Sequence, residues 1–196
     1  MGLLEEKRSV VVVIDLQGKL MEMAHRSKLV IAATNRLMHL ADAFNIPVIL
    51  TEQYPQGLGV THPDVRTVFD GLSTTTRYVD KISFGCCGEP RFMQALDEVL
   101  PDVSATQRQV VIAGIEAHVC VMQTVLELKR MGCDTHVCWE CVSGRGEEYR
   151  RHALDRMQQA GAVLTNHESV CFEWARDKNH RAFKAMNMIL REGQLT

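Results

Sequence analysis

The chain has 196 residues, of which 46% are hydrophobic, a size that suits one hydrophobic core and is short for two. Its 22 lysines and arginines nearly balance its 24 aspartates and glutamates, and the net charge is -2, so no global basic field draws it to nucleic acid or to anionic lipid. We therefore expect a single domain over residues 1–196 that acts on a small molecule rather than on nucleic acid or a membrane.

The seven cysteines are an odd number, and no apolar leader sequence precedes them. This favours reduced thiols inside the cell over a secreted disulfide framework. The acidic start, with Glu5 and Glu6, does not suit a transit peptide. We expect a cytoplasmic protein, and the sequence leaves an association with mitochondria open.

The first half of the chain alternates strand and helix patterns. Residues 9–16, "SVVVVIDL", form a β-branched run ending in a lone acid, which is typical of a strand buried on both faces of a parallel sheet. Residues 27–45 carry apolar side chains at helical spacing, and residues 46–52 follow as a second strand. The stretch 53–76 is rich in Gly, Pro, Thr and His, and it predicts an irregular loop at the rim of a site.

The second half continues the alternation. A short strand at 77–81 precedes a helix whose first turn suits Glu89 and Pro90 and which reaches Leu100. The pattern predicts a three-layer α/β fold, Rossmann-like and doubly wound, with a mainly parallel six-stranded sheet ordered 3-2-1-4-5-6. The remaining predicted elements are strands at 109–114, 134–139 and 161–165, and helices at about 119–131, 146–160 and 178–191.

Three reactive side chains follow predicted strands: Asp15, Lys81 and Cys120. Ligands bind beyond the carboxyl ends of such a sheet where strand order reverses, and there the first and fourth strands bring Asp15 and Cys120 together. A helix start and Lys81 would lower the pKa of the Cys120 thiol, and Asp15 would carry its proton. The spacing leaves open an alternative in which Asp15 caps a turn, Lys81 is solvated and Cys120 is a small buried hydrophobe.

Four blocks of the chain resemble the isochorismatase-like cysteine hydrolase superfamily in order and spacing, over about residues 9–170. They are "VVVIDLQ" (11–17), "TEQYPQGLG" (51–59), "DKISF" (80–84) and "AGIEAHVCVMQT" (113–124).

This resemblance implies a catalytic triad of Asp15, Lys81 and Cys120. It also implies a cis peptide bond between Ile115 and Glu116, and an oxyanion hole made by the backbone N–H groups of Glu116 and Cys120. In members that use this triad, the cysteine attacks a carbonyl or nitrile-type carbon and forms an acyl-enzyme, which water then hydrolyses.

The block at 51–59 looks most like the isochorismatase domain-containing subgroup, some of whose protozoan members carry the label mitochondrial-associated ribonuclease. Nicotinamidases of the superfamily hold a metal with an Asp-x-His and two further histidines, whereas His62 is the only histidine in this stretch. Isochorismatases carry Gly where this chain has Cys120. The resemblance therefore implies a hydrolase without metal or cofactor, acting on a small amide-like substrate and forming a homo-oligomer, a dimer or tetramer.

Four further residues are expected to line the substrate pocket: Gln17, Tyr54, Phe84 and His118. For His118, a packing role is an equal alternative. Many members carry Thr at the position of Ala117, so the identity of the substrate stays open.

The motif "CWEC" falls on a predicted strand and lacks a second pair of ligands at zinc spacing, so a structural role is expected for Cys138 and Cys141. The roles of Cys86 and Cys87 stay open. Two other functions remain as alternatives. One is a ribonuclease, which only local basic patches support, and the other is an inactive scaffold that oligomerises through its Met-rich C-terminal helix.

Overall fold

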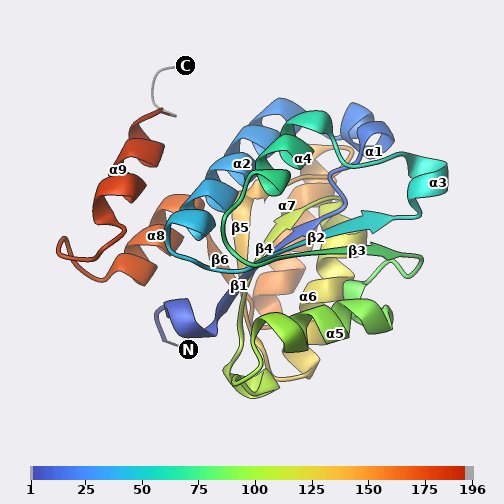
Figure 1. Ribbon diagram of the computed structural model, residues 1–196. Coiled ribbons are helices and arrows are strands. Elements are labelled where there is room, and N and C mark those ends of the chain that lie inside the picture. The colour runs from blue at the N-terminus through green and yellow to red at the C-terminus, as the bar shows by residue number, and fades with distance from the viewer. Residues whose placement is uncertain (1, 193–196) are drawn as a thin grey trace.

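The computed structural model describes residues 2–192, which form a six-stranded sheet between two layers of helices (Figure 1). The strand order is β3-β2-β1-β4-β5-β6 and every pairing is parallel, which confirms the predicted fold class and order. The strands are β1 (Ser9–Ile14), β2 (Val48–Gln53), β3 (Thr76–Lys81), β4 (Gln109–Gly114), β5 (Asp134–Val142) and β6 (Val163–Thr165).

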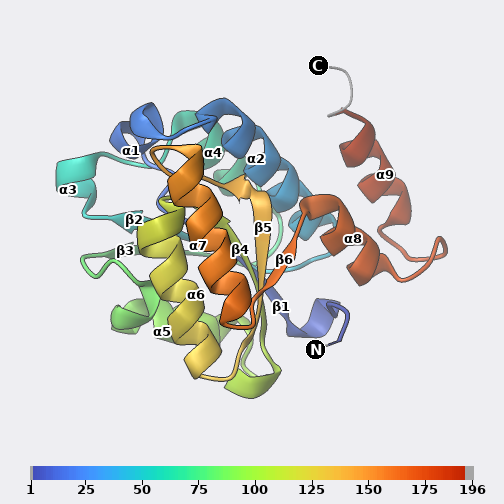
Figure 2. The same cartoon turned by 180° about the vertical axis from the view of Figure 1, so that it is seen from behind.

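Helices α1, α2 and α4 cover one face of the sheet, α5, α6 and α7 cover the other, and α8 and α9 lie beside the β6 edge (Figures 1 and 2). Within residues 2–192, no helix has the length and apolar character needed to cross a membrane. The helices are α1 (Gly18–Met23), α2 (Ser27–Ala43), α3 (Pro55–Leu58), α4 (Pro63–Asp70), α5 (Pro90–Val99), α6 (Met122–Arg130), α7 (Glu147–Gln159), α8 (His167–Ala175) and α9 (Phe183–Glu192), with short turns η1 (Glu6–Arg8), η2 (Cys86–Gly88), η3 (Ala105–Gln107) and η4 (Ala117–Val121).

The central strand β1 explains the β-branched run in the sequence. All six of its residues are buried, because successive side chains point into opposite cores. Val11 and Val13 join the core under α2, whereas Val10 and Val12 join the core under α5 and α6. The same two-sided burial applies to β4.

The prediction of an irregular loop at 53–76 was wrong. Pro55 and Pro63 each occupy the first turn of a short helix, where the missing N–H of proline costs nothing. His62 caps α4, because its Nδ1 accepts a hydrogen bond from the Asp64 N–H at 3.3 Å. The lone histidine of this stretch is therefore a capping residue.

The end of the chain also differs from the prediction. Helix α8 was not predicted, although Asn166 caps its start by accepting a hydrogen bond from the Ser169 N–H at 2.8 Å. The last helix begins at Phe183 rather than at residue 178. Its Met186 is buried in the core that α2 covers, so this helix uses part of its apolar surface within the same chain.

Candidate active site

The ends of three strands bring Asp15, Lys81 and Cys120 together, as the sequence predicts. Asp15 directly follows β1, Lys81 is the last residue of β3, and Cys120 lies in the η4 turn after β4. The charges of Asp15 and Lys81 both act on the Cys120 thiol. Asp15 has a φ of 52°, a left-handed conformation that turns the chain away from the strand.

Asp15 and Lys81 form an ion pair that is excluded from water. The Lys81 Nζ lies 2.7 Å from the Asp15 Oδ2, and neither side chain has any exposed surface. The same Nζ donates to the Gln53 Oε1 at 2.8 Å and to the Phe84 carbonyl oxygen at 3.0 Å. The alternative of a solvated Lys81 is therefore wrong. Although burial opposes its charge, the Asp15 carboxylate raises the pKa of Lys81 above its ordinary value.

The Asp15 carboxyl has a second partner, since its Oδ1 accepts a hydrogen bond from the Thr51 Oγ1 at 2.7 Å. Burial raises the pKa of Asp15 above its ordinary value, although Lys81 and Thr51 both favour the charged form. A carboxyl group with a raised pKa in a fixed position is suited to accepting and returning a proton.

The Cys120 thiol does not have the lowered pKa that the sequence predicts. Burial raises the pKa of Cys120 well above its ordinary value, and the negative charge of Asp15 adds to this effect. Lys81 acts in the expected direction but is outweighed. The raised pKa favours the thiol over the thiolate in the resting site, so a general base is needed when the sulfur attacks.

The turn that carries Cys120 depends on a close approach of two strands. Gly114 has a φ of 129°, and a Cβ atom built on it would lie 2.1 Å from the Ile14 carbonyl oxygen. A residue with a side chain therefore cannot replace this glycine without moving the backbone. The next peptide bond, Ile115–Glu116, is cis, as the resemblance implies.

The backbone of the η4 turn is held from two sides. The Glu116 carbonyl oxygen accepts hydrogen bonds from the N–H groups of Val119 at 3.0 Å and Val121 at 3.3 Å. The Ala117 N–H donates to the Ser143 carbonyl oxygen at 2.6 Å. The Glu116 N–H has no acceptor among residues 2–192, which leaves it free to donate to a ligand.

The Glu116 side chain reaches out of the turn. Its Oε1 accepts from the Nε of Arg145 at 2.8 Å, which links η4 to the loop between β5 and α7. Arg145 itself is exposed, so this ion pair lies at the protein surface.

Two threonines near the reactive groups were not predicted. The Thr124 Oγ1 donates to the Cys120 carbonyl oxygen at 2.7 Å and accepts from the Cys86 N–H at 2.9 Å. Thr51, on the strand between β1 and β3, orients Asp15. The predicted strand order could have identified Thr51 as a site residue. In that order the second strand lies between the first and the third, so its end must lie between Asp15 and Lys81.

The predicted pocket residues occupy different environments. Gln17 is fully buried, and its Nε2 donates to the carbonyl oxygens of Gln53 at 3.0 Å and Gly59 at 2.6 Å. The structure therefore gives Gln17 a role in holding the loop after β2. Tyr54 and Phe84 are about half exposed at the ends of β2 and β3, where a ligand can reach them.

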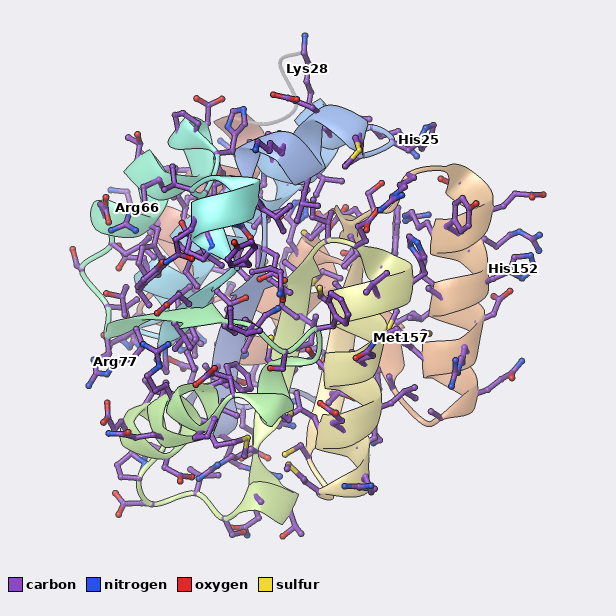
Figure 3. All side chains as sticks on the ribbon, turned by 90° about the vertical axis from the view of Figure 1, so that its right-hand side faces the viewer. His25, Lys28, Arg66, Arg77, His152 and Met157 are labelled. Atoms are coloured by element: carbon purple, nitrogen blue, oxygen red, sulfur yellow. The ribbon has the colours of Figure 1, made fainter. Side chains whose placement is uncertain are left out.

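His118 stacks on Tyr149, with ring centroids 4.8 Å apart, and borders a cavity of about 410 Å³ between η4 and α7. The wall of that cavity includes His152, which projects from α7 away from the sheet, whereas Met157 of the same helix is buried (Figure 3). His118 thus both packs on Tyr149 and borders a cavity, and its role as a substrate-pocket residue stays a prediction.

The other cysteines have structural surroundings. Cys138 and Cys141 are buried on β5, as predicted for the "CWEC" motif, and the Cys141 thiol together with burial raises the pKa of Cys138. Burial raises the pKa of Cys86 to about 12. Within residues 2–192, no group of three His, Cys, Asp or Glu side chains is arranged to hold a metal ion.

The Isochorismatase domain family matches residues 9–169 of this chain. The chain belongs to the isochorismatase family. It is 34% identical over 191 residues to isochorismatase domain-containing protein 2 from Xenopus laevis, and the aligned region covers 97% of this chain and 87% of that relative.

Solved structures agree with this assignment. A structure described as the MAR1 ribonuclease from Caenorhabditis elegans is 32% identical, with a TM-score of 0.86, over 97% of this chain and 93% of that one. The YcaC gene product from Escherichia coli, described as an octameric hydrolase of unknown specificity, is 23% identical, with a TM-score of 0.80, over 100% of this chain and 98% of that one. This second likeness concerns the fold.

Proposed function

We propose that this isochorismatase family member is a cysteine hydrolase that cleaves small amides or related compounds through a covalent intermediate on Cys120. The observation that carries the proposal is the buried Asp15–Lys81 pair, at 2.7 Å, whose two charges both act on the Cys120 thiol. An isolated buried charge pair is costly to maintain, and such perturbed groups concentrate at functional sites.

In the first half of the reaction, the proton of the Cys120 thiol passes to the Asp15 carboxylate as the sulfur attacks the substrate carbonyl carbon. The carbonyl electron pair moves to oxygen, and the backbone N–H groups of Glu116 and Cys120 hold the resulting oxyanion. When the C–N bond breaks, Asp15 returns the proton to the departing nitrogen. An amine leaves, and a thioester remains on Cys120.

In the second half, Asp15 takes a proton from water, and the hydroxide oxygen attacks the thioester carbon. The C–S bond breaks, the sulfur regains a proton from Asp15, and a carboxylic acid leaves. Lys81 stays positively charged throughout and holds the carboxylate in position, because it is fixed by three acceptors at 2.7 to 3.0 Å. The raised pKa of Cys120 fits this scheme, since the proton is lost only during the attack.

The substrate has to be small or slender. Cys120 is 5% exposed, so only a narrow group reaches the sulfur. The half-exposed rings of Tyr54 and Phe84 offer apolar surface to a substrate that approaches Cys120. We infer an unbranched or planar acyl group rather than a peptide or a polymer.

The test is to incubate the protein with a panel of small amides and to look for an acyl adduct on the peptide that contains Cys120. Cys120→Ala should lose hydrolysis by about a thousandfold or more and form no adduct. Cys87→Ala is the matched control, because Cys87 lies in the neighbouring η2 turn and has no role in the scheme. If Cys120→Ala keeps full activity, the proposal fails.

RNA cleavage is a second candidate, and one observation favours it: the relative from Caenorhabditis elegans is described as a ribonuclease. A net charge of -2 gives it little electrostatic support. This candidate predicts RNA cleavage that survives Cys120→Ser and weakens with added salt. Purified protein without such cleavage would remove it.

We also propose that the protein assembles as a homo-oligomer, a dimer or tetramer. The support is the family membership and the octameric state named for the Escherichia coli protein. Light scattering after gel filtration gives the mass directly, and a monomer at micromolar concentration would contradict the proposal.

A further inference from the structure

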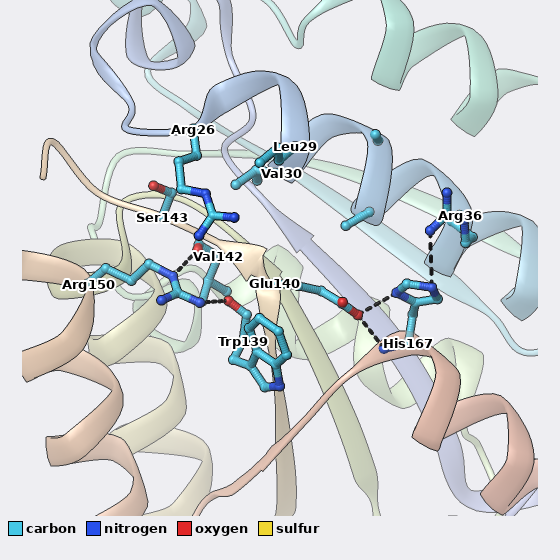
Figure 4. A pocket seen from close by; sticks show the side chains of 12 residues that line it. Arg26, Leu29, Val30, Arg36, Trp139, Glu140, Val142, Ser143, Arg150 and His167 are labelled. Carbon is cyan, nitrogen blue, oxygen red and sulfur yellow. Dashed lines mark hydrogen bonds and ion pairs between the residues drawn. The ribbon is translucent and has the colours of Figure 1, made fainter. Parts of the chain in front are cut away.

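A cavity of about 330 Å³ lies away from Cys120, between the start of α2, the end of β5 and the first residue of α8 (Figure 4). Its size is that of a site for a small organic molecule. It arises because β6 has only three residues and pairs with β5 no further than Cys138, so the last part of β5 has no outer neighbour.

Arg150 fills part of the place that a longer β6 would take. Its Nε donates to the Val142 carbonyl oxygen at 2.9 Å, and its Nη2 donates to the carbonyl oxygen of Trp139. Its Nη1 forms an ion pair with Glu147 at 2.9 Å. Most hydrogen-bond donors of Arg150 are therefore already occupied within the protein. Its guanidinium group makes the outer edge of β5 polar and positively charged.

Arg26 and Arg36 place positive charge at opposite ends of the cavity (Figure 4). The Arg26 side chain makes no hydrogen bond or ion pair within residues 2–192, and Arg36 contacts only the Nε2 of His167, at 3.3 Å. The single carboxylate in the wall is that of Glu140. Even with Arg150 assigned to Glu147, two guanidinium groups face one carboxylate.

The charge of Glu140 is already engaged. Its Oε1 accepts from the backbone N–H of His167 at 2.7 Å and also contacts the Nδ1 of that residue. Because a guanidinium group has no acceptor, the Nε2 of His167 must accept from Arg36, and Nδ1 must carry the hydrogen toward Glu140. The chain Arg36–His167–Glu140 thus engages the Arg36 guanidinium at its end of the cavity, and Arg26 is left as the guanidinium group that can receive a ligand.

The rest of the wall is apolar. Leu29 and Trp139 both border the cavity, and both are large hydrophobic residues with 55% and 42% of their surface exposed. Val30 contributes a buried side chain to the same wall. A ligand that covered Leu29 and Trp139 would remove their apolar surface from water.

We propose that this cavity binds a small organic carboxylate with an apolar body, the carboxylate on Arg26 and the body against Leu29 and Trp139. A guanidinium group matches a carboxylate in shape and charge, and an exposed tryptophan ring next to it favours a ligand that is both anionic and apolar. The proposal does not depend on the chemistry of Cys120.

This site differs from the strand-end crevice. Cys120 packs in the core under α5, α6 and α7, whereas the cavity lies on the α2 side of the sheet. One residue touches both places: Ser143 borders the cavity, and its carbonyl oxygen accepts the hydrogen bond from Ala117 in the η4 turn.

The test is a titration of the whole protein with cyclohexanecarboxylate, followed by tryptophan fluorescence. Trp139 lies in the cavity wall and Trp174 is buried elsewhere, so Trp139→Phe should remove the signal. We expect saturable binding that weakens at least about tenfold in Arg26→Gln. Arg130→Gln, at the end of α6 and outside the cavity, should bind like the unaltered protein.

Two related compounds define the ligand class. Cyclohexylmethanol has the same body without the charge, and inorganic phosphate has charge without the body; both should bind at least about tenfold more weakly than the carboxylate. Arg26→Gln should leave the fold intact, because the Arg26 side chain has no hydrogen bond or ion pair within residues 2–192 to lose. Absence of saturation below about 10 mM, equal binding of the alcohol or phosphate, or equal weakening in Arg130→Gln would overturn the proposal.

Discussion

The Nζ of Lys81 lies 2.7 Å from the Oδ2 of Asp15, and both side chains are closed off from solvent. The two residues come from β3 and from the end of β1, which are separated in the sheet by β2. The pair therefore spans three strands. The pair forms only when β1, β2 and β3 end at the same height in the sheet. Its formation therefore depends on the correct register between these three strands.

Removing one partner of this pair should be costly. Lys81→Met leaves Asp15 buried without its counter-ion, and we expect the free energy of unfolding to fall by about 3 to 5 kcal/mol. The double variant Asp15→Asn, Lys81→Met removes both charges, and Asn tolerates the positive φ at position 15, so part of that loss should return. Urea unfolding measures both, and a loss below about 1 kcal/mol in the single variant would show that the pair is not an ion pair in solution.

The reactivity of Cys120 toward iodoacetamide should depend on Asp15. Burial and the Asp15 charge raise the pKa of the thiol, so alkylation should be slow near neutral pH and faster as the pH rises. Asp15→Asn removes the negative charge and leaves that of Lys81, which lowers the thiol pKa. We expect faster alkylation of Cys120 in this variant together with loss of hydrolysis, measured by mass spectrometry of the Cys120 peptide across pH. Slower alkylation would contradict the assignment of Asp15.

The contact between Glu140 and His167 should make the stability of the folded protein depend on pH in the acidic range. Burial alone would raise the pKa of Glu140, but the hydrogen bonds from His167 hold it below the ordinary value of 4.5. Since the folded pKa is lowered, this contribution is present above about pH 4.5 and is lost as the pH falls through the folded pKa. The difference in Tm between the unaltered protein and Glu140→Gln should therefore shrink between about pH 6 and pH 3. A difference that stays constant over that range would rule out this contribution.

Gly114 should tolerate no side chain. In Gly114→Ala the new Cβ would meet the Ile14 carbonyl oxygen, and the positive φ adds strain, so we expect a loss of more than about 2 kcal/mol of stability. Gly18→Ala is the matched control, because a Cβ at Gly18 meets nothing within 4 Å. Thermal unfolding compares the two, and equal Tm values would show that the backbone at Gly114 adapts.

The sequence predicted the sheet well because β1 and β4 are buried on both faces and leave a strong apolar signal. It also placed Asp15, Lys81 and Cys120 at one edge, since strand ends and strand order are enough for that. It did not predict the pKa of Cys120, because the balance between burial and two opposite charges depends on distances that spacing does not give. The helix capped by His62 was missed because a cap and a loop residue look alike in sequence.

The register of the central strand also has a consequence for synthesis of the chain. Ser9 pairs with Gln109, a hundred residues later, and the other edge of β1 pairs with β2 much earlier. At about 5 to 20 residues per second, the ribosome needs roughly 5 to 20 s to deliver that second partner. During this interval the fully buried strand β1 has at least one open edge, and a chaperone that shields extended hydrophobic segments has a target there.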